Sequence, residues 1–321
     1  MSAPTLNALV YALRHEAQGV IGVELRPVPG APDFPAFDAG SHIDLHLPNG
    51  LVRSYSLVNP VTDRQRYVVG VLNDRASRGG SRHVHEQVRV GTVLPISAPR
   101  NNFKLHEDAA HTVLLAGGIG VTPIFCMLQR LAQLGKPVDF IYCARSRKEA
   151  AFIADIEAFA DANIRLDWHF DDEQGVPPNL KQLLAGRPAH THLYCCGPTP
   201  MLDAFERSCE TLGYANAHIE RFAAVQTAVP AAAAGYMVEL KRTGKTIEVP
   251  PGKSLLDTLL DAGLSPDYSC KEGICGACET KVLAGEVEHH DDILTKAERA
   301  ANKSMMICVS RCRRGSLVLD L

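Results

Sequence analysis

Several features that would indicate a membrane, a secreted protein or a nucleic-acid partner are missing from this sequence of 321 residues. Its longest apolar run, residues 113–125, is interrupted by three glycines, whereas a membrane-spanning helix needs about 20 apolar residues in succession. The amino terminus has no basic segment followed by a long apolar core, so we expect no signal peptide. The net charge of −3 gives no reason to expect nucleic acid or a membrane surface as partner.

Ten cysteines are present, but their placement does not indicate disulfide bonds. Four belong to one motif, and the others mostly lie within apolar runs, where free buried thiols are common. These others are Cys126, Cys143, Cys195, Cys196, Cys209 and Cys312. A reducing cytosol is therefore the expected compartment.

The cysteine motif lies in SCKEGICGACET, residues 269–280, where Cys270, Cys275 and Cys278 have C-x4-C-x2-C spacing. Two irons bridged by sulfide need four thiolates, and one tight loop can present three of them, so we expect Cys308 to supply the fourth. Gly273 and its neighbour Gly276 suit a loop that turns sharply and directs N–H groups at anionic sulfur. The spacing is that of plant-type [2Fe–2S] clusters.

Three other interpretations of these cysteines are weaker. A dithiol redox motif at Cys275 and Cys278 leaves Cys270 unexplained and lacks the helix-opening setting of a thioredoxin. A zinc site of four thiolates normally uses two C-x2-C units, and only one is present. Ligation by Cys312 in place of Cys308 departs from the pattern.

Residues 1 to about 105 have the pattern of short strands joined by turns. In HIDLHLPNGLVRSYSLV, apolar and polar residues alternate over 43–47, and Asn49-Gly50 is typical of a tight hairpin. Prolines and glycines follow one another closely and no long helical period occurs, which predicts a small antiparallel barrel. Two segments in it stand out, Arg53–Leu57 (RSYSL) and Arg78–Ser81 (RGGS). The second is a glycine-rich turn before a short helix whose free N–H groups would suit a phosphate, although each segment alone is also ordinary for a strand or a loop.

Residues 110 to about 222 alternate between strands and helices. Apolar strands are predicted at 112–116, 138–143, 166–170 and 192–196, and helices at 124–134, at 148–159 and from the last strand to near Gly213. Such alternation predicts an open parallel sheet with helices on both faces. GGIGVTP and CGPTP both follow strands, at the sheet edge where α/β proteins bind ligands. Neither is the G-x-G-x-x-G fingerprint, but two glycine turns at one edge favour a nucleotide.

The remaining chain predicts a linker and a small third domain. Residues 225–235 are nearly uncharged and alanine-rich. A hairpin around Thr243-Gly244, a short helix after the N-cap Ser254, the cysteine loop and a closing strand LVLDL make up a β-grasp module. The predicted boundaries are 1–106 for a flavin-binding barrel, 107–224 for a Rossmann-like nicotinamide domain, 225–235 for the linker and 236–321 for the ferredoxin domain.

Taken in order, RSYSL, RGGS, GGIGVTP, CGP and the four cysteines resemble the phthalate dioxygenase reductase family over essentially the whole chain. Its members are reductase components of two-component Rieske oxygenases. The resemblance implies FMN rather than FAD, a [2Fe–2S] cluster, NADH rather than NADPH, and a separate terminal oxygenase as partner. Arg145 and Arg147 follow the strand at 138–143, and such arginines can also accept the 2′-phosphate of NADPH.

Residue by residue, the resemblance implies three sets of ligands. Expected against the flavin are Arg53, Ser54, Tyr55, Ser56, Gly70, Val71, Leu72, Gly79, Gly80, Ser81, Thr122 and Phe222. Expected against the nicotinamide nucleotide are Gly117, Gly118, Gly120, Cys196, Gly197 and Pro198. Expected on the cluster are Cys270, Cys275, Cys278 and Cys308. No acid or base is assigned, and Ser56 and Cys196 are preferred over the scattered histidines as candidates for setting hydride geometry.

Hydride from NADH carries two electrons and the cluster takes one, so the expected route runs from NADH through the flavin to the cluster and onward. The sequence has no C-x-H segment of a Rieske cluster, so we do not expect the chain to be the oxygenase itself. His289-His290-Asp291-Asp292 is interpreted as a solvated loop rather than a metal site. Alternatives are a reductase for a cytochrome P450 or a soluble ferredoxin, and a ferredoxin-like carrier without reductase activity. A monomer is expected.

Overall fold

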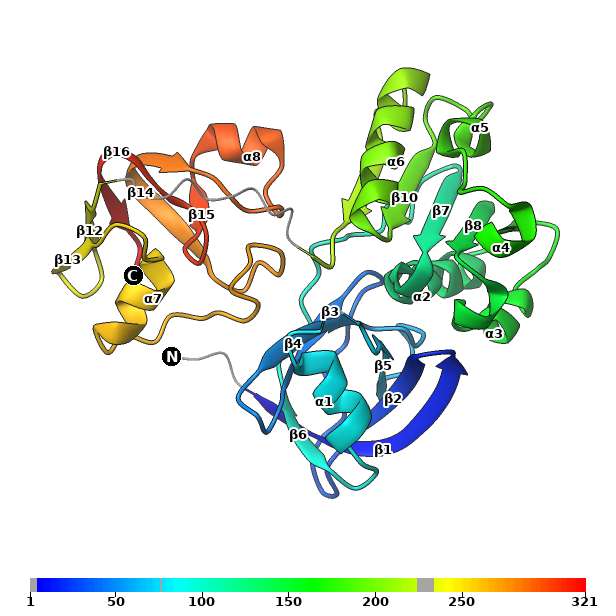
Figure 1. Cartoon of the computed structure of the whole chain (residues 1–321), viewed down its shortest axis with the longest axis horizontal. Helices are drawn as coiled ribbons and strands as arrows, with labels where there is room; N and C mark the ends of the chain where they lie inside the picture. Colours follow the sequence, from blue (N-terminus) through cyan, green and yellow to red (C-terminus); the bar gives the residue numbers. More distant parts are fainter. Residues whose placement is uncertain (1–4, 76, 224–233) are drawn as a thin grey trace. The chain divides into compact units, whose positions relative to one another are not determined.

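The computed structural model describes residues 5–75, 77–223 and 234–321 and divides into two compact units, shown in Figure 1. One unit contains Thr5–Phe222, and the other begins at Ala223 and ends at Leu321. Most of the predicted linker, 225–233, lies outside the described residues. Within the described ranges, no helix has the length and apolar character needed to cross a membrane.

The first part of the larger unit is a six-stranded antiparallel sheet in the order β4-β3-β6-β1-β2-β5. Its strands are β1 (Leu6–Ala17), β2 (Val20–Pro27), β3 (His42–His46), β4 (Val52–Ser56), β5 (Tyr67–Leu72) and β6 (Val93–Ile96), and its helix is α1 (Gly80–Gln87). The predicted hairpin is confirmed, because β3 pairs with β4 and Gly50 adopts a left-handed φ of 79°. A bridge between Leu57 and Val69 joins the two edges of the sheet, as expected of a small barrel.

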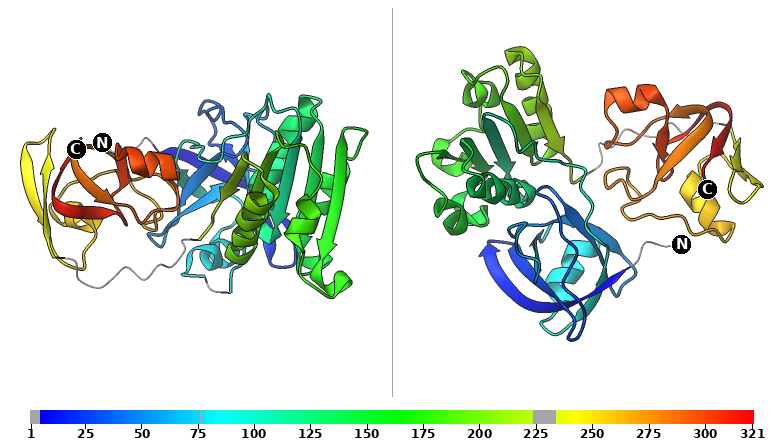
Figure 2. Two further views of the ribbon diagram at one scale, coloured as in Figure 1. Left: turned by 90° about the horizontal axis from the view of Figure 1, so that it is seen from above. Right: turned by 180° about the vertical axis from the view of Figure 1, so that it is seen from behind.

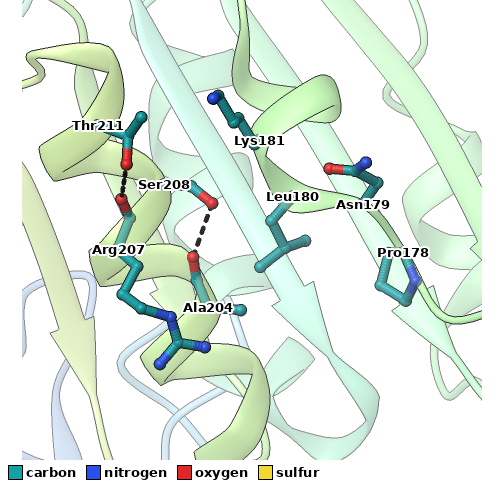
Figure 3. Close-up of a pocket in the computed structure, with 8 residues that line it drawn as sticks. All are labelled: Pro178, Asn179, Leu180, Lys181, Ala204, Arg207, Ser208 and Thr211. Atoms are coloured by element: carbon teal, nitrogen blue, oxygen red, sulfur yellow. Dashed lines mark hydrogen bonds between the residues drawn. The ribbon is translucent and has the colours of Figure 1, made fainter.

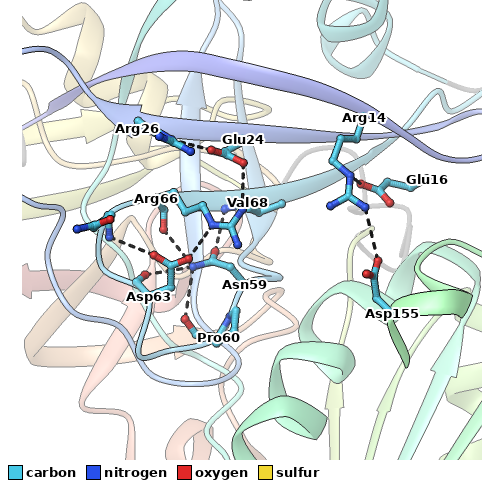
Figure 4. Close-up of polar contacts among 11 residues, drawn as sticks. Arg14, Glu16, Glu24, Arg26, Asn59, Pro60, Asp63, Arg66, Val68 and Asp155 are labelled. Carbon is cyan, nitrogen blue, oxygen red and sulfur yellow. Dashed lines mark hydrogen bonds and ion pairs between the residues drawn. The ribbon is translucent and has the colours of Figure 1, made fainter. Parts of the chain in front are cut away.

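A polar network fixes the loop between β4 and β5, as Figure 4 shows. The Asn59 side chain accepts a hydrogen bond from the Val68 N–H (2.8 Å) and donates to the Arg66 carbonyl (3.0 Å). The Arg66 guanidinium bonds Asp63 (2.6 Å) and Glu24 (3.0 Å), and these partners raise its pKa. The loop is therefore tied to β2 and to the start of β5, which fixes where β5 lies.

The second part of the larger unit is a parallel sheet in the order β11-β10-β7-β8-β9. Its strands are β7 (Thr112–Gly117), β8 (Val138–Ala144), β9 (Ile164–Phe170), β10 (His192–Cys196) and β11 (Ala217–Glu220). Its helices are η1 (Gly118–Gly120), α2 (Val121–Gln133), η2 (Arg147–Glu149), α3 (Ile153–Glu157), α4 (Asp171–Gln174), α5 (Leu180–Leu184) and α6 (Thr199–Leu212). Alternate residues of β7 pack on opposite faces: Leu114 shares a core with α2, and Leu115 shares one with α5 and α6. Figure 2 shows this part from two further sides.

One predicted helix of this sheet is wrong in extent. In place of a helix over 148–159, the chain forms η2 and the short α3. Phe152 between them has a φ of 62°, which an aromatic residue rarely adopts. Its side chain is buried near Phe125 (6.0 Å between ring centroids). Tertiary packing thus overrides the helical pattern here.

The smaller unit forms one five-stranded sheet in the order β13-β12-β16-β14-β15 around its own core. Its elements are β12 (Tyr236–Leu240), β13 (Lys245–Val249), α7 (Leu255–Asp261), β14 (Glu279–Glu288), α8 (Lys296–Ala301), β15 (Ser304–Met306) and β16 (Arg311–Leu319). The predicted N-cap is confirmed, because the Ser254 hydroxyl accepts from the Asp257 N–H (3.0 Å). The parallel pairing of the first strand with the last, β12 with β16, is the arrangement expected of a β-grasp module.

Candidate functional site

Arg53 and the RGGS turn lie together at the start of α1. The Arg53 guanidinium donates to the Val52 carbonyl (2.8 Å) and the Arg78 carbonyl (3.4 Å). A Cβ at Gly80 would come within 2.6 Å of the Arg53 side chain, so only glycine allows this approach. The first turn of α1 has no acidic residue. A guanidinium beside a helix N-terminus fits a phosphate group.

The loop before α1 is held by Ser77, which the sequence did not single out. Its hydroxyl oxygen accepts hydrogen bonds from the Gly79 N–H (3.2 Å) and from the Ser81 hydroxyl (2.9 Å). Gly79 has a φ of 93°, which favours glycine, and it directly precedes the helix. These contacts preorganise the turn that we expect to hold the flavin phosphate.

The other residues of β4 divide by face. The half-buried Tyr55 has its pKa raised to about 12 by burial, so the ring stays neutral. The Ser54 hydroxyl donates to Asp44 (2.6 Å), so it is already hydrogen-bonded within the barrel. Burial alone would raise the pKa of Asp44, but Arg100, 2.7 Å away, and Ser54 together hold it below the usual range.

β5 contacts the parallel-sheet part through Gly70. A Cβ at Gly70 would lie 2.7 Å from Thr122 Cγ2 and 3.3 Å from the Phe152 ring, so the absence of a side chain allows the two parts to meet. The structure therefore brings together Gly70 and Thr122, which were predicted as flavin neighbours from distant motifs. Next in β5, Val71 is buried and Leu72 is exposed.

The glycines of GGIG and CGP pack against one another at the carboxyl edge of the parallel sheet. A Cβ at Gly120 would lie 2.2 Å from the Cys196 carbonyl oxygen, and one at Gly117 would lie 3.1 Å from the Gly197 Cα. Gly118 differs: its φ is 52° and a Cβ there would meet open space. Because Gly117 and Gly120 have no side chain, the GGIG and CGP loops can pack against each other. Gly118 and the exposed Pro198 instead border solvent.

Ser56, Cys196 and Glu220 converge where the barrel meets the sheet. The Ser56 hydroxyl donates to Glu220 Oε2 (3.4 Å), and Glu220 is the ladder partner of Cys196. Although Glu220 as a whole is partly exposed, burial of its carboxyl raises its pKa to about 8. Burial also raises the pKa of Cys196 well above its ordinary value, so the thiol stays protonated. We call Ser56, Gly70, Thr122, Cys196 and Glu220 the junction.

Sequence reasoning missed Glu220, because β11 was not predicted. The available signal was a lone acidic residue in HIERF, just after the helix that CGP begins. Phe222, expected near the flavin, follows β11 and is 41% exposed.

Arg147 is held by carboxylates on neighbouring elements. Its guanidinium lies 3.4 Å from Glu173 and 3.9 Å from Glu157, and it stands 4.6 Å over the Phe170 ring. The Arg145 side chain is exposed, and its carbonyl accepts from the Asp172 N–H. The Arg147 guanidinium is therefore already paired with carboxylates, which lowers its capacity to bind a 2′-phosphate.

In the smaller unit, the four predicted ligands lie on the loop of residues 269–280, here called the cluster loop, and on the segment after β15. Cys278 Sγ lies 3.2 Å from Cys308 Sγ. A hydrogen bond from the Cys275 thiol, followed by contacts with backbone N–H groups, lowers the pKa of Cys270 to about 6. Convergent thiols and inward N–H groups fit an anionic iron–sulfur centre. The Cys312 thiol instead donates to the Arg314 carbonyl (3.2 Å) on β16.

Residues 289–292 form a loop, as predicted, but the prediction that this loop is solvated is wrong. Asp291 is 1% exposed, and its carboxylate accepts from the Ser310 hydroxyl (3.2 Å). The Asp292 N–H donates to the carbonyl of Gly273 in the cluster loop (2.9 Å). This segment supports the cluster loop through partners distant in sequence, which the local spacing of charges could not indicate.

A hollow of about 340 Å³ lies between α5 and α6, away from these residues (Figure 3). The Ser208 and Thr211 hydroxyls that line it donate to carbonyls of their own helix. None of the residues that line the hollow was predicted to contact the flavin, the nucleotide or the cluster, so the hollow is not part of the candidate site.

Comparisons with known proteins cover both units. Residues 238–313 match the 2Fe-2S iron-sulfur cluster binding domain, and residues 97–219 match the N-terminal domain of dimethylamine monooxygenase subunit DmmA-like proteins. The chain is 43% identical to a vanillate O-demethylase oxidoreductase of Pseudomonas putida, over 98% of this chain and 100% of that protein.

Two solved structures are similar over nearly the whole chain. Phthalate dioxygenase reductase, described as a modular structure for electron transfer from pyridine nucleotides to [2Fe–2S], matches with a TM-score of 0.70 and 31% identity over 99% of this chain and 98% of that one. An intact type IV self-sufficient cytochrome P450 monooxygenase matches with a TM-score of 0.90 and 36% identity, over 100% of this chain and 42% of that one.

Proposed function

Because the chain belongs to the phthalate dioxygenase reductase family, we propose that it is the reductase component of a two-component Rieske non-haem iron oxygenase or demethylase. It takes electrons from NADH, passes them through FMN to its own [2Fe–2S] cluster, and delivers them to the separate oxygenase.

The observation that carries this proposal is the junction. Within one compact unit, Ser56 on the RSYSL strand lies 3.4 Å from Glu220, the ladder partner of Cys196 in CGP. Two motifs that suit different cofactors thereby meet at the carboxyl edge of the sheet, where α/β proteins bind ligands. A ferredoxin-like carrier would have no need of such a meeting point.

The residues present fit the cofactors. Arg53, Gly79, Gly80 and Ser81 would hold the flavin phosphate, and Tyr55 and Thr122 would flank its ring. A bound flavin accepts a two-electron hydride and releases single electrons, whereas the protein supplies orientation and electrostatics. At the junction, Glu220 holds a proton near neutral pH and Ser56 donates a hydrogen bond to it, so this carboxyl would present no full negative charge to a bound flavin.

The proposed domains are 1–106 for FMN, 107–224 for NADH and 236–321 for the cluster, with a linker over 225–235. The break between the compact units after Phe222 supports the last boundary. The carboxylates around Arg147 support NADH over NADPH. We also propose a cytoplasmic monomer without a nucleic-acid or membrane partner.

An anaerobic titration with NADH and then NADPH tests the relay. We expect substoichiometric NADH to bleach the flavin band and reduce the cluster, and acid to release FMN. Cluster absorbance alone, with no response to either nucleotide, would contradict the proposal.

A second acceptor deserves its own test because the chain is similar to part of a self-sufficient P450. In that case electrons would leave the cluster for a haem protein. Rates measured with a purified Rieske oxygenase and with a P450 under identical NADH supply would distinguish the two acceptors.

A further inference from the structure

Three histidines gather at the amino edge of the parallel sheet, at the opposite end of β10 from Cys196. His192 begins β10, His218 lies on β11, and His106 belongs to the segment between β6 and β7. One ring nitrogen from each lies within 4.8 Å of the others. These residues are far apart in the sequence, so the pattern of histidines gave no signal.

The spacing suits a small cation. His192 Nδ1 lies 3.1 Å from His218 Nε2, and the ring centroids of His106 lie 4.7 Å and 5.1 Å from those of the other two. Zinc–nitrogen bonds of about 2.0–2.1 Å in a tetrahedral arrangement place neighbouring nitrogens roughly 3.3 Å apart. The first pair is thus already near the separation that zinc requires.

Tyr194 contacts the ring of His218 and the backbone of His106. It is the ladder partner of His218, whose ring stacks on it at 4.5 Å. Its hydroxyl oxygen accepts a hydrogen bond from the backbone N–H of His106 (2.8 Å). Because alternate residues of a strand point to the same face, His192 lies on the same side of β10 as Tyr194.

The segment that carries His106 is fixed from its other side as well. Glu107 makes two hydrogen bonds of 2.7 Å to the Arg130 guanidinium on α2. Imidazole nitrogens are preferred zinc ligands.

We propose that His106, His192 and His218 bind one Zn²⁺ ion, with solvent as the fourth ligand, and that the ion ties the segment before β7 to β10 and β11. His106 is exposed, which gives the ion a path from solvent. None of the three histidines belongs to the junction, and His218 lies two residues before Glu220 on β11.

The test uses the full chain with flavin and cluster in place. Wild type, His106→Gln, His218→Gln and the control His15→Gln, an exposed residue on β1, are freed of loosely bound metal and dialysed against Zn²⁺ alone. We expect wild type and the control to retain one more zinc per chain than the other two. In His106→Gln and His218→Gln, zinc binding should weaken by more than about 100-fold.

X-ray absorption at the zinc edge then identifies the ligands, with three imidazole nitrogens expected. The thermal midpoint followed by Trp168 fluorescence should rise with Zn²⁺ in wild type but not in His106→Gln. The His106 side chain is exposed, so its replacement leaves the core packing unchanged. Equal zinc in all four proteins, or sulfur as the main ligand, would overturn the proposal.

Discussion

The cluster loop is built from residues that are close together in the sequence, whereas the junction is built from residues that are far apart. Three cluster ligands lie within nine residues, 270–278, and the backbone N–H groups around them come from the same loop. At the junction, Ser56 and Glu220 are 164 positions apart and meet only because two sheets pack together. The first site is therefore set mainly by local spacing, and the second by the fold of a whole unit.

The largest expected effect comes from replacing one cluster ligand, which should remove the cluster and leave the junction intact. Cys308→Ser should abolish the cluster and lower the reduction of a one-electron acceptor by more than about 100-fold, because one of four thiolates is lost. Flavin reduction by NADH should persist, because the junction lies in the other unit. Visible spectra and stopped-flow traces measure both quantities.

The matched control is Cys312→Ser, since Cys312 is also buried and lies four residues away. Its thiol bonds a carbonyl on β16, so the cluster should remain. Loss of the cluster in Cys312→Ser and its retention in Cys308→Ser would reverse the assignment.

A smaller effect probes the shape of the cluster loop. Gly273 and Gly252 have nearly equal φ values, 72° and 76°, so alanine strains both backbones by about 1–2 kcal/mol. Only at Gly273 would the new Cβ also meet Val309 (2.6 Å) and the Asp291 Cα (3.0 Å). Gly273→Ala should therefore lower the free energy of unfolding by about 1–3 kcal/mol more than Gly252→Ala, measured by urea denaturation. Equal losses of unfolding free energy in the two variants would show that the contacts of the new Cβ with Val309 and Asp291 do not affect stability.

The same contrast explains what could be predicted. The barrel, the parallel sheet, the β-grasp module and the cysteine set follow from short-range patterns such as Asn49-Gly50 and the C-x4-C-x2-C spacing. Glu220, Ser77 and Asp291 were missed, because their roles depend on partners contributed by the tertiary fold. The interrupted helix at Phe152 has the same cause, since buried aromatic packing outweighs its local helical pattern.

A third change tests the electrostatics of the junction. The folded pKa of Glu220 is about 8, against 4.5 for an ordinary glutamate, so its protonated form stabilises the folded state. That contribution is complete below about pH 4.5 and is lost as the pH rises towards 8. The wild type should lose about 2 kcal/mol more than Glu220→Gln between these limits, after allowance for partial exposure.

Trp168, the single tryptophan, reports unfolding of the unit that contains the junction, so its fluorescence can follow this difference. The control is Glu210→Gln, an exposed position on α6 that should retain the pH dependence of the wild type. Identical pH profiles for wild type and Glu220→Gln would mean that the carboxyl is not protonated in the folded protein.

The smallest expected effect concerns the nucleotide preference at the sheet edge beside the junction. Glu173→Gln removes one of the two carboxylates near Arg147 and leaves its guanidinium freer to meet a 2′-phosphate. An exposed ion pair is worth less than about 1 kcal/mol, so the kcat/KM ratio of NADPH to NADH should rise only about two- to fivefold. Steady-state kinetics with both nucleotides measure it, and the rise should vanish in the double variant Glu173→Gln/Arg147→Ala. If the rise persists in the double variant, residues other than Arg147 discriminate between NADH and NADPH. If the rise disappears, the preference for a nucleotide is also set by partners that are distant in the sequence.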